Sequence, residues 1–154
     1  MHPGGIWTAT RGAFSISTDP ALLDRPLIHE FLSRSYWARG IPRETVDRSI
    51  EGALCFGLYE GSSQVGFARV ITDRATFAYL ADVFVLESHR GQGLAVWLME
   101  AVRSHPDLQG LRRWILMTRD AHGLYEKSGF RVIEDPGRCM EIVDRDVYTR
   151  RGPE

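Results

Sequence analysis

The segment from Tyr79 to Val102 constrains the fold most, because an almost continuously apolar run leads through a glycine-containing turn directly into an amphipathic helix. The apolar run, 76–86, predicts a central strand covered on both faces. The helix is predicted from Gly93 to about His105. A strand, a short turn and a helix start expose backbone N–H groups that point one way, with the positive end of the helix dipole behind them. This arrangement predicts a cradle for an anion, and phosphate is its natural ligand.

The turn RGQGLA, residues 90–95, suits such a cradle. A Cβ at Gly91 or Gly93 would hold a phosphate away from the amides or forbid the dihedrals that the loop needs. Arg90 can add a charge-assisted contact. A Walker pattern is excluded, because no Lys-Ser or Lys-Thr follows the second glycine. A dinucleotide fingerprint fits poorly, since Val96 occupies the position of its third glycine and no parallel βαβ unit precedes the turn.

The rest of the chain predicts a mixed sheet. Alternation at 14–18 indicates an edge strand, and helical spacing continues from Pro20 to about Arg39, with a kink or restart at Pro26. A short helix follows Pro42. The ranges 54–60 and 64–73 form a predicted hairpin, and the chain ends with a strand at 112–118, a short helix at 122–127 and strands at 130–133 and 139–143. The order β-α-α-β-β-β-α-β-α-β-β allows only part of the sheet to be parallel, so we expect an α/β or α+β mixed fold.

Composition limits the number of domains, the partners and the location that we expect. The 154 residues, 44% of them hydrophobic, fit one domain spanning 1–154 with a core at about 14–143. The 19 basic and 20 acidic side chains form no long single-sign run, which gives no reason to expect nucleic acid or an anionic membrane as partner. The sequence has neither a membrane-length apolar stretch nor a signal-like start, so we expect a soluble, cytoplasmic protein.

Metal and disulfide sites are not expected. Cys55 and Cys139 lie far apart without a CxxC partner, which predicts two buried, reduced thiols. His89 and His122 have no companions at metal-ligand spacing and are predicted to face solvent.

Two motifs resemble one known family. Arg90-x-x-Gly93-x-Ala95 is similar to the pyrophosphate-binding motif of the GCN5-related N-acetyltransferase (GNAT) superfamily, Gln/Arg-x-x-Gly-x-Gly/Ala, and YLADVFVLESHRG before it resembles the fourth strand of that fold. AHGLYEKSGF, residues 121–130, matches the late motif Ala-x-x-Leu-Tyr-Glu-Lys-x-Gly-Phe at every defined position. Together with the order of elements, the resemblance covers about 14–143. It implies a GNAT-like fold whose central mixed sheet splays between its fourth and fifth strands.

The resemblance also implies acetyl-CoA as cosubstrate, without a metal. The residues implied for the cofactor are Val83, Phe84, Val85, Arg90, Gly91, Gln92, Gly93, Leu94, Ala95, Thr118, Ala121 and Tyr125. The strand residues would pair with the pantetheine arm, and an amide of Val85 or its neighbour would stabilise the oxyanion. Tyr125 matches the tyrosine that assists the departing thiolate. Thr118 stands where an asparagine is common.

The proton acceptor stays open at this stage. Ala81 replaces a glutamate that polyamine acetyltransferases carry before the aspartate, whereas Asp82 is retained. Strand alternation predicts that these two side chains point to opposite faces, so Asp82 would not inherit the missing carboxylate's place. Asp82, a water that it orders, or a partly neutral substrate are the alternatives, and Asp82 could equally tie down a loop. Tyr125 could likewise be a core tyrosine.

The expected function is transfer of an acetyl group to a primary amine of a small molecule or protein by direct attack in a ternary complex. Tyr36, Trp37 and Arg69 are candidates for the acceptor pocket, with packing and surface roles as the alternative. Two other functions stay open: a catalytically weak acyl-CoA-binding module, and an acyltransferase with another donor or acceptor. A homodimer is also left open.

Overall fold

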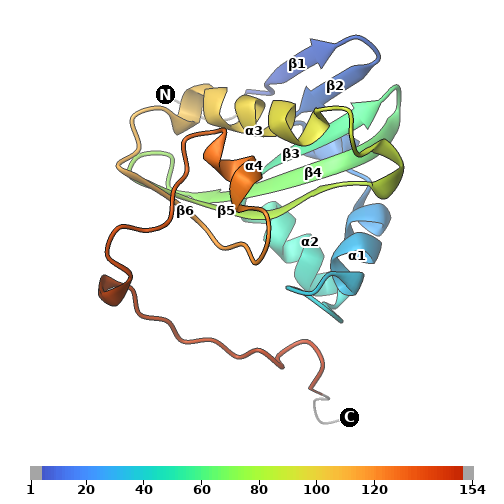
Figure 1. Ribbon diagram of the computed structural model, residues 1–154. Coiled ribbons are helices and arrows are strands. Elements are labelled where there is room, and N and C mark those ends of the chain that lie inside the picture. Colours follow the sequence, from blue (N-terminus) through green and yellow to red (C-terminus); the bar gives the residue numbers. More distant parts are fainter. Residues whose placement is uncertain (1–4, 151–154) are drawn as a thin grey trace.

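A mixed six-stranded sheet forms the centre of the computed structural model, which describes residues 5–150 (Figure 1). Its strands lie in sequence order, β1 (Thr8–Arg11), β2 (Phe14–Ser17), β3 (Leu54–Glu60), β4 (Ser63–Thr72), β5 (Phe77–Val85) and β6 (Arg113–Leu116). All neighbours are antiparallel except β5 and β6, which are parallel because a helical crossover joins them. The predicted mixed fold is confirmed.

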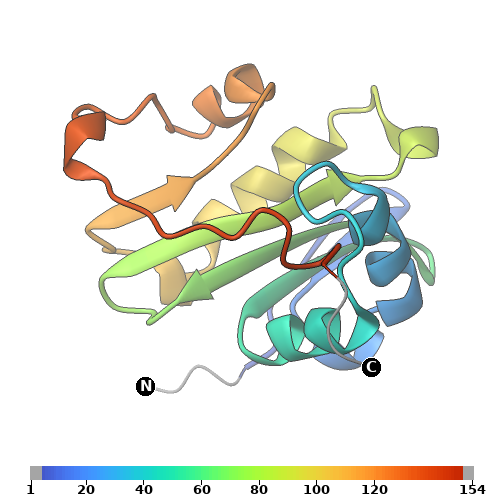
Figure 2. The same ribbon diagram turned by 90° about the horizontal axis from the view of Figure 1, so that it is seen from below.

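Helices cover both faces of this sheet (Figures 1 and 2). On one face α3 (Leu94–Ser104) buries Leu98 and Val102 against Phe56 and its neighbours. On the other face lie α1 (Arg25–Arg34) and α2 (Arg43–Glu51), and the short α4 (His122–Glu126) follows β6. Single 3₁₀ turns occur at Pro20–Leu22, Glu87–His89, Pro106–Leu108 and Pro136–Arg138. Within residues 5–150 no helix has the length and apolar character that a bilayer crossing requires.

The first helical region is shorter and more divided than the sequence predicts. The restart at Pro26 is confirmed, since Asp24 caps α1 by accepting a hydrogen bond from the Leu27 N–H at 3.1 Å. The helix ends at Arg34 rather than near Arg39. Ser35 Oγ donates to the Leu32 carbonyl and accepts from the Ala38 N–H, which turns the chain into a loop at 35–41.

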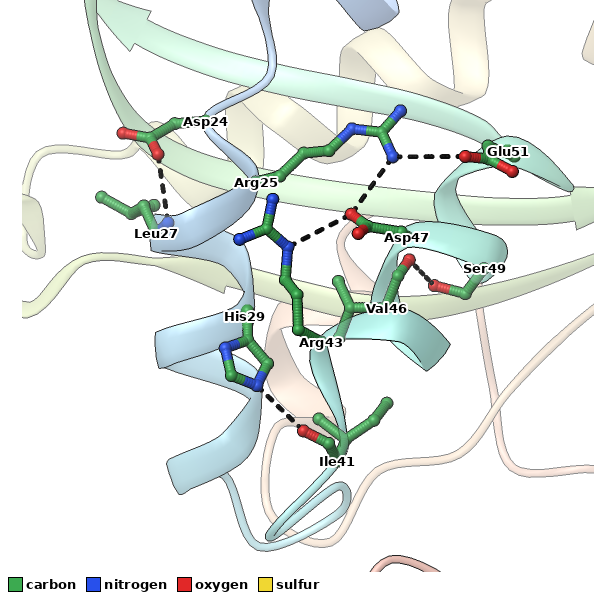
Figure 3. A network of polar contacts seen from close by, with 10 residues as sticks. All are labelled: Asp24, Arg25, Leu27, His29, Ile41, Arg43, Val46, Asp47, Ser49 and Glu51. Atoms are coloured by element: carbon green, nitrogen blue, oxygen red, sulfur yellow. Dashed lines mark hydrogen bonds and ion pairs between the residues drawn. The ribbon is translucent and has the colours of Figure 1, made fainter.

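Polar contacts join α1 to α2 and hold the end of this loop (Figure 3). Arg25 lies 3.2 Å from Asp47, which also accepts from Arg43 at 3.3 Å. His29 Nε2 lies 3.0 Å from the Ile41 carbonyl oxygen, where the loop leaves for α2. The helix pair therefore acts as a frame that positions Tyr36 and Trp37.

The chain departs from the predicted order at both ends. The short strand β1 is not predicted, because TATR has little apolar character; it forms as the partner of β2 across a turn at Gly12. The predicted strands at 130–133 and 139–143 are wrong, since neither segment is a strand in the structure. Within the described chain, the backbone hydrogen bonds of residues 131–150 are all local to that segment. Cys55 is buried as predicted, but Cys139 is exposed because the strand meant to bury it does not form.

Candidate active site

The sheet opens between β5 and β6. Phe77–Leu80 pair with Arg113–Leu116, and the pairing stops there, so that no residue of Ala81–Val85 pairs with β6. A β-bulge lies at the point of separation, where Asp82 and Val83 stand opposite the single residue Ala68. Bulges bend a strand and increase its twist, which accounts for the divergence. The backbone edge of Val83–Val85 that faces β6 is thus left without a strand partner in the described structure.

Asp82 holds the bulge in place. It has a positive φ of 55°, and its carboxylate accepts from Arg69 Nε at 2.8 Å and from Trp37 Nε1 at 2.9 Å. The Asp82 side chain is only 9% exposed, so this ion pair is shielded from water. One carboxylate therefore joins β5, β4 and the loop at 35–41.

The expectation that Ala81 and Asp82 point to opposite faces is wrong. Ala81 stands opposite Arg69 in the β4–β5 register, and Asp82 contacts the same arginine. The extra residue of the bulge and the left-handed backbone at Asp82 interrupt the alternation that a regular strand would impose.

A hollow of about 170 Å³ lies where β5 meets α3. Its lining consists of Val85, His89, Arg90, Gly91, Gly93, Leu94, Ala95 and Val96. Gly91 and Gly93 have φ of 83° and 78°, the left-handed region that glycine adopts without strain. The first α3 bond joins the Trp97 N–H to the Gly93 carbonyl, and the N–H groups of residues 94–96 have no partner within residues 5–150. Three donors and the positive helix end thus gather at one hollow, as the sequence predicts.

Side-chain contacts hold the loop before α3. Arg90 Nε donates to the Val85 carbonyl at 3.1 Å, and Gln92 Nε2 donates to the His89 carbonyl at 3.3 Å. His89 was expected to face solvent, but its ring nitrogens lie 2.8 Å from Ser88 Oγ and 2.8 Å from Glu60 Oε1. Glu60 is remote in sequence, so no local pattern could reveal this contact. The hollow is therefore braced against β3.

Tyr125 lies on α4, at the β6 side of the opening. Its ring packs edge-on against Phe130, with centroids 6.1 Å apart, and Phe130 packs against Trp114 in the same way. Burial raises the pKa of Tyr125 to about 12, and nearby Tyr36 adds to the effect. The phenol therefore stays protonated at neutral pH and can donate a hydrogen bond. Thr118 Oγ1 accepts from the Ala121 N–H at 3.0 Å and so shapes the start of α4.

The loop at 35–41 reaches the segment that follows β6. Tyr36 accepts a hydrogen bond from the Arg119 N–H at 3.2 Å, and the Arg119 guanidinium carbon lies 3.8 Å from the centroid of the Tyr36 ring. Trp37 packs edge-on against Tyr36 at 5.1 Å. Sequence reasoning missed Arg119, because no motif marks it beyond its position next to Thr118. The structure thus brings Tyr36, Trp37 and Arg69 to the same side of the opening.

The chain belongs to the GNAT family. The family model described as an acetyltransferase (GNAT) domain matches residues 51–132, more than half of the chain. Acetyltransferase FG08082 of Gibberella zeae is 36% identical, in a match that covers 77% of this chain and 79% of the fungal protein. A GNAT-family structure from Xanthomonas campestris pv. campestris is 52% identical, with a TM-score of 0.87 over 89% of this chain and 97% of the other.

More distant structures share the fold alone. Glucosamine-6-phosphate N-acetyltransferase of Arabidopsis thaliana is 15% identical, with a TM-score of 0.57 over 91% of this chain and 97% of the other. An acetyltransferase of Clostridium acetobutylicum, solved with acetyl-CoA, is 14% identical, with a TM-score of 0.59 over 90% of this chain and 95% of the other. Among residues 5–150, no three His, Cys, Asp or Glu side chains gather as a metal site would require.

We predict that Asp82→Asn lowers the free energy of unfolding by about 3 kcal/mol, because it leaves the Arg69 guanidinium shielded without a counter-charge. Asparagine keeps the side-chain size and tolerates a positive φ, so the variant isolates the charge. Glu30→Gln, which removes the exposed pair with Arg34, is the control and should cost less than about 1 kcal/mol. Urea unfolding of the three proteins measures both effects. Equal stabilities of Asp82→Asn and Glu30→Gln would show that the contacts of Asp82 with Arg69 and Trp37 do not hold the bulge.

Proposed function

We propose that this protein is a cytoplasmic N-acetyltransferase that passes the acetyl group of acetyl-CoA to a primary amine. One observation carries the proposal: Val85 belongs both to the hollow at the start of α3 and to the unpaired edge of β5. If the diphosphate of acetyl-CoA binds in the hollow, the pantetheine arm of the cofactor would follow this edge. The opening between β5 and β6 then leads from the anion site toward Tyr125.

The cofactor would be held mainly by backbone groups. The N–H groups of residues 94–96 bind the diphosphate, aided by the helix dipole. Gly91, Gly93 and Gln92 shape the loop, and Arg90 supplies positive charge. The pantetheine amides pair with backbone groups of Val83, Phe84 and Val85 as an added strand would. Thr118 and Ala121 border the pantetheine arm from the opposite side.

The reaction proceeds by direct attack. A neutral amine adds to the thioester carbonyl carbon, and the oxyanion that forms is stabilised by the N–H of Val85 or its neighbour. The carbon–sulfur bond then breaks, and the Tyr125 phenol donates a hydrogen bond to the departing thiolate. A phenol with a pKa of about 12 is a weaker acid than an ordinary thiol at ~8.5, so hydrogen bonding is favoured over full proton transfer.

Asp82 contributes to this reaction by positioning other parts of the site, not as a base. Both of its carboxylate oxygens already accept strong hydrogen bonds, from Arg69 and Trp37. A base must approach the amine directly or through one water, and these contacts occupy the carboxylate instead. We therefore propose that Asp82 holds the bulge and the loop at 35–41, while a water molecule accepts the proton of the attacking amine.

The acceptor would bind beside the half-exposed rings of Tyr36 and Trp37. Their surfaces, with Arg69 and Arg119 adjoining, suit an amine carried on a small molecule or on a protein side chain. The Arabidopsis enzyme is too distant to assign its acceptor to this chain. An acyl-CoA-binding module that has lost turnover, and a different acyl donor, are the competing proposals.

A panel of amines tests the function. Release of free CoA thiol from acetyl-CoA, followed with a thiol reagent, should rise above hydrolysis for at least one class of primary amine. Propionyl-CoA in a parallel series tests the donor. Tight acetyl-CoA binding with no thiol release from any amine would support the binding module and refute the enzyme.

We predict that Tyr125→Phe lowers kcat about 10- to 100-fold, because a hydrogen bond to a charged group contributes about 1.5–3 kcal/mol. The affinity for acetyl-CoA should hardly change, as expected for an interaction made in the transition state. Steady-state kinetics and calorimetric titration measure the two quantities. Tyr148→Phe, outside the site, is the matched control. Equal kcat values for Tyr125→Phe and the wild type would remove Tyr125 from the mechanism.

We also predict that Gly93→Val weakens acetyl-CoA binding at least roughly 100-fold, since several hydrogen bonds to a charged phosphate would be lost together. Gly110→Val is the control. Gly110 has a φ of 76°, close to the 78° of Gly93, but it lies outside the hollow. Both variants should lose about 1–2 kcal/mol of stability from the left-handed backbone. If both variants bind acetyl-CoA as the wild type does, the cradle is not the diphosphate site.

A further inference from the structure

The guanidinium of Arg69 has more hydrogen-bond donors than the protein uses. Its Nε donates to Asp82, whereas Nη1 and Nη2 make no hydrogen bond to any of residues 5–150. The Arg69 side chain is only 15% exposed, so most of this group is shielded from water. A shielded guanidinium with two nitrogens free matches the geometry of an oxyanion that accepts two parallel hydrogen bonds.

A second donor without a partner lies beside the same ion pair. Ala81 stands opposite Arg69, and strand alternation brings Tyr79 of β5 to the same face. Burial raises the pKa of Tyr79, and the charge of Asp82 adds to this effect while that of Arg69 opposes it. The phenol is thus near both charges and stays protonated at neutral pH. It makes no hydrogen bond within the described chain, so its O–H is free to donate to a ligand.

Arg119 brings a second guanidinium to the acceptor side of the opening. It lies over the Tyr36 ring, 3.8 Å from the centroid. Asp120 approaches Arg119 only to 3.9 Å, and both side chains are mostly exposed, so this pair is weak. A guanidinium stacked on a ring keeps its in-plane N–H groups available for an oxyanion. The loop at 35–41 adds a further arginine, Arg39, and no acidic residue.

The acidic group at this place is already engaged. The two oxygens of Asp82 accept from Arg69 and from Trp37, and the side chain is only 9% exposed. No carboxylate oxygen is therefore left for a second ammonium group of an acceptor. An aromatic face can attract a cation, but Arg119 already lies over the ring of Tyr36. A diamine would bring its extra positive charge to two guanidinium groups, which disfavours it.

We propose that the acceptor is an amine that also carries an oxyanion, a carboxylate or a phosphate, bound by Arg69, Tyr79 and Arg119. This inference rests on the proposed acetyl transfer, since it names the class of amine that the same site selects. Amino acids and amino phosphate esters are the simplest molecules of this class. With the oxyanion held at the arginines, the amine at the other end of the molecule is free to approach the thioester.

The Trp37 indole gives a local signal for binding, because its N–H donates to Asp82 beside Arg69. The chain has four tryptophans, and the indole signal that is lost in Trp37→Phe assigns the resonance in ¹⁵N NMR spectra. The wild type is titrated, with and without CoA, with 4-aminobutyrate, 2-aminoethyl phosphate, butylamine and 1,4-diaminobutane. We expect an oxyanion-bearing amine to shift the Trp37 signal and to bind at least about tenfold more tightly than butylamine or the diamine. The tighter of the two oxyanion ligands tells carboxylate from phosphate. Equal or tighter binding of butylamine or the diamine, or no shift with either oxyanion ligand, would overturn the proposal.

Two variants test the oxyanion contacts, because a substitution of Arg69 would also break its pair with Asp82. Arg119→Gln removes an exposed charge, and Tyr79→Phe removes a single hydroxyl. Each should weaken binding of the oxyanion ligand about tenfold and change butylamine binding less than about twofold. Arg48→Gln is the matched control, since Arg48 is exposed on α2 and makes no side-chain contact within the described chain. Wild-type affinity for the oxyanion ligand in both Arg119→Gln and Tyr79→Phe would contradict the assignment.

Release of CoA thiol separates this inference from the proposed function. If an oxyanion-bearing amine binds beside Trp37 but no amine releases thiol from acetyl-CoA, the acetyl transfer is refuted and the oxyanion contacts are supported. If thiol is released only with amines that lack an oxyanion, the enzyme is supported and the inference is overturned.

Discussion

The ion pair between Asp82 and Arg69, with the Trp37 indole bonded to the same carboxylate, is the contact on which the site depends. It fixes the β-bulge that turns β5 away from β6, so the opening in the sheet exists because one extra residue is held there. The same carboxylate ties down the loop at 35–41, which carries Tyr36. A single shielded charge thus sets both the split in the sheet and the position of the loop that carries Tyr36 and Trp37. A glutamate at position 81 is dispensable for that architecture, because the bulge is held without it.

The hollow at the start of α3 owes its character to backbone geometry. Left-handed glycines at 91 and 93 let the loop turn, and the first N–H groups of α3 have no acceptor in the described chain. The His89–Glu60 contact braces the loop from β3. Donors that are fixed before the ligand arrives lose little conformational freedom on binding, which favours affinity. The edge of β5 that lacks a strand partner begins where this hollow ends. In the proposed function, the diphosphate site and the pantetheine site are therefore parts of one continuous groove.

Local signals predicted the elements nearest the site. The run from β5 through the turn into α3, the β3–β4 hairpin and the restart at Pro26 each follow from residues close in sequence. The features that the sequence did not predict share a different cause, which is contact between residues remote in sequence. The bulge at Asp82 reflects a contact with Arg69, thirteen residues earlier, and the brace at His89 reflects Glu60. The strand predicted at 139–143 does not form, because a strand needs a neighbour and residues 131–150 make only local backbone hydrogen bonds in the described chain.

The sequence by itself determined the family, the order of most elements and the glycine turn that forms the hollow at the start of α3, because these depend on short-range pattern and on glycine at defined positions. The tertiary structure decided the face on which Asp82 lies, the stacking of Arg119 on Tyr36 and the exposure of Met140 and Ile142. Each of these depends on which distant segments meet across the sheet. Pairing between remote residues is set by the packing of the whole fold, and no local pattern encodes it.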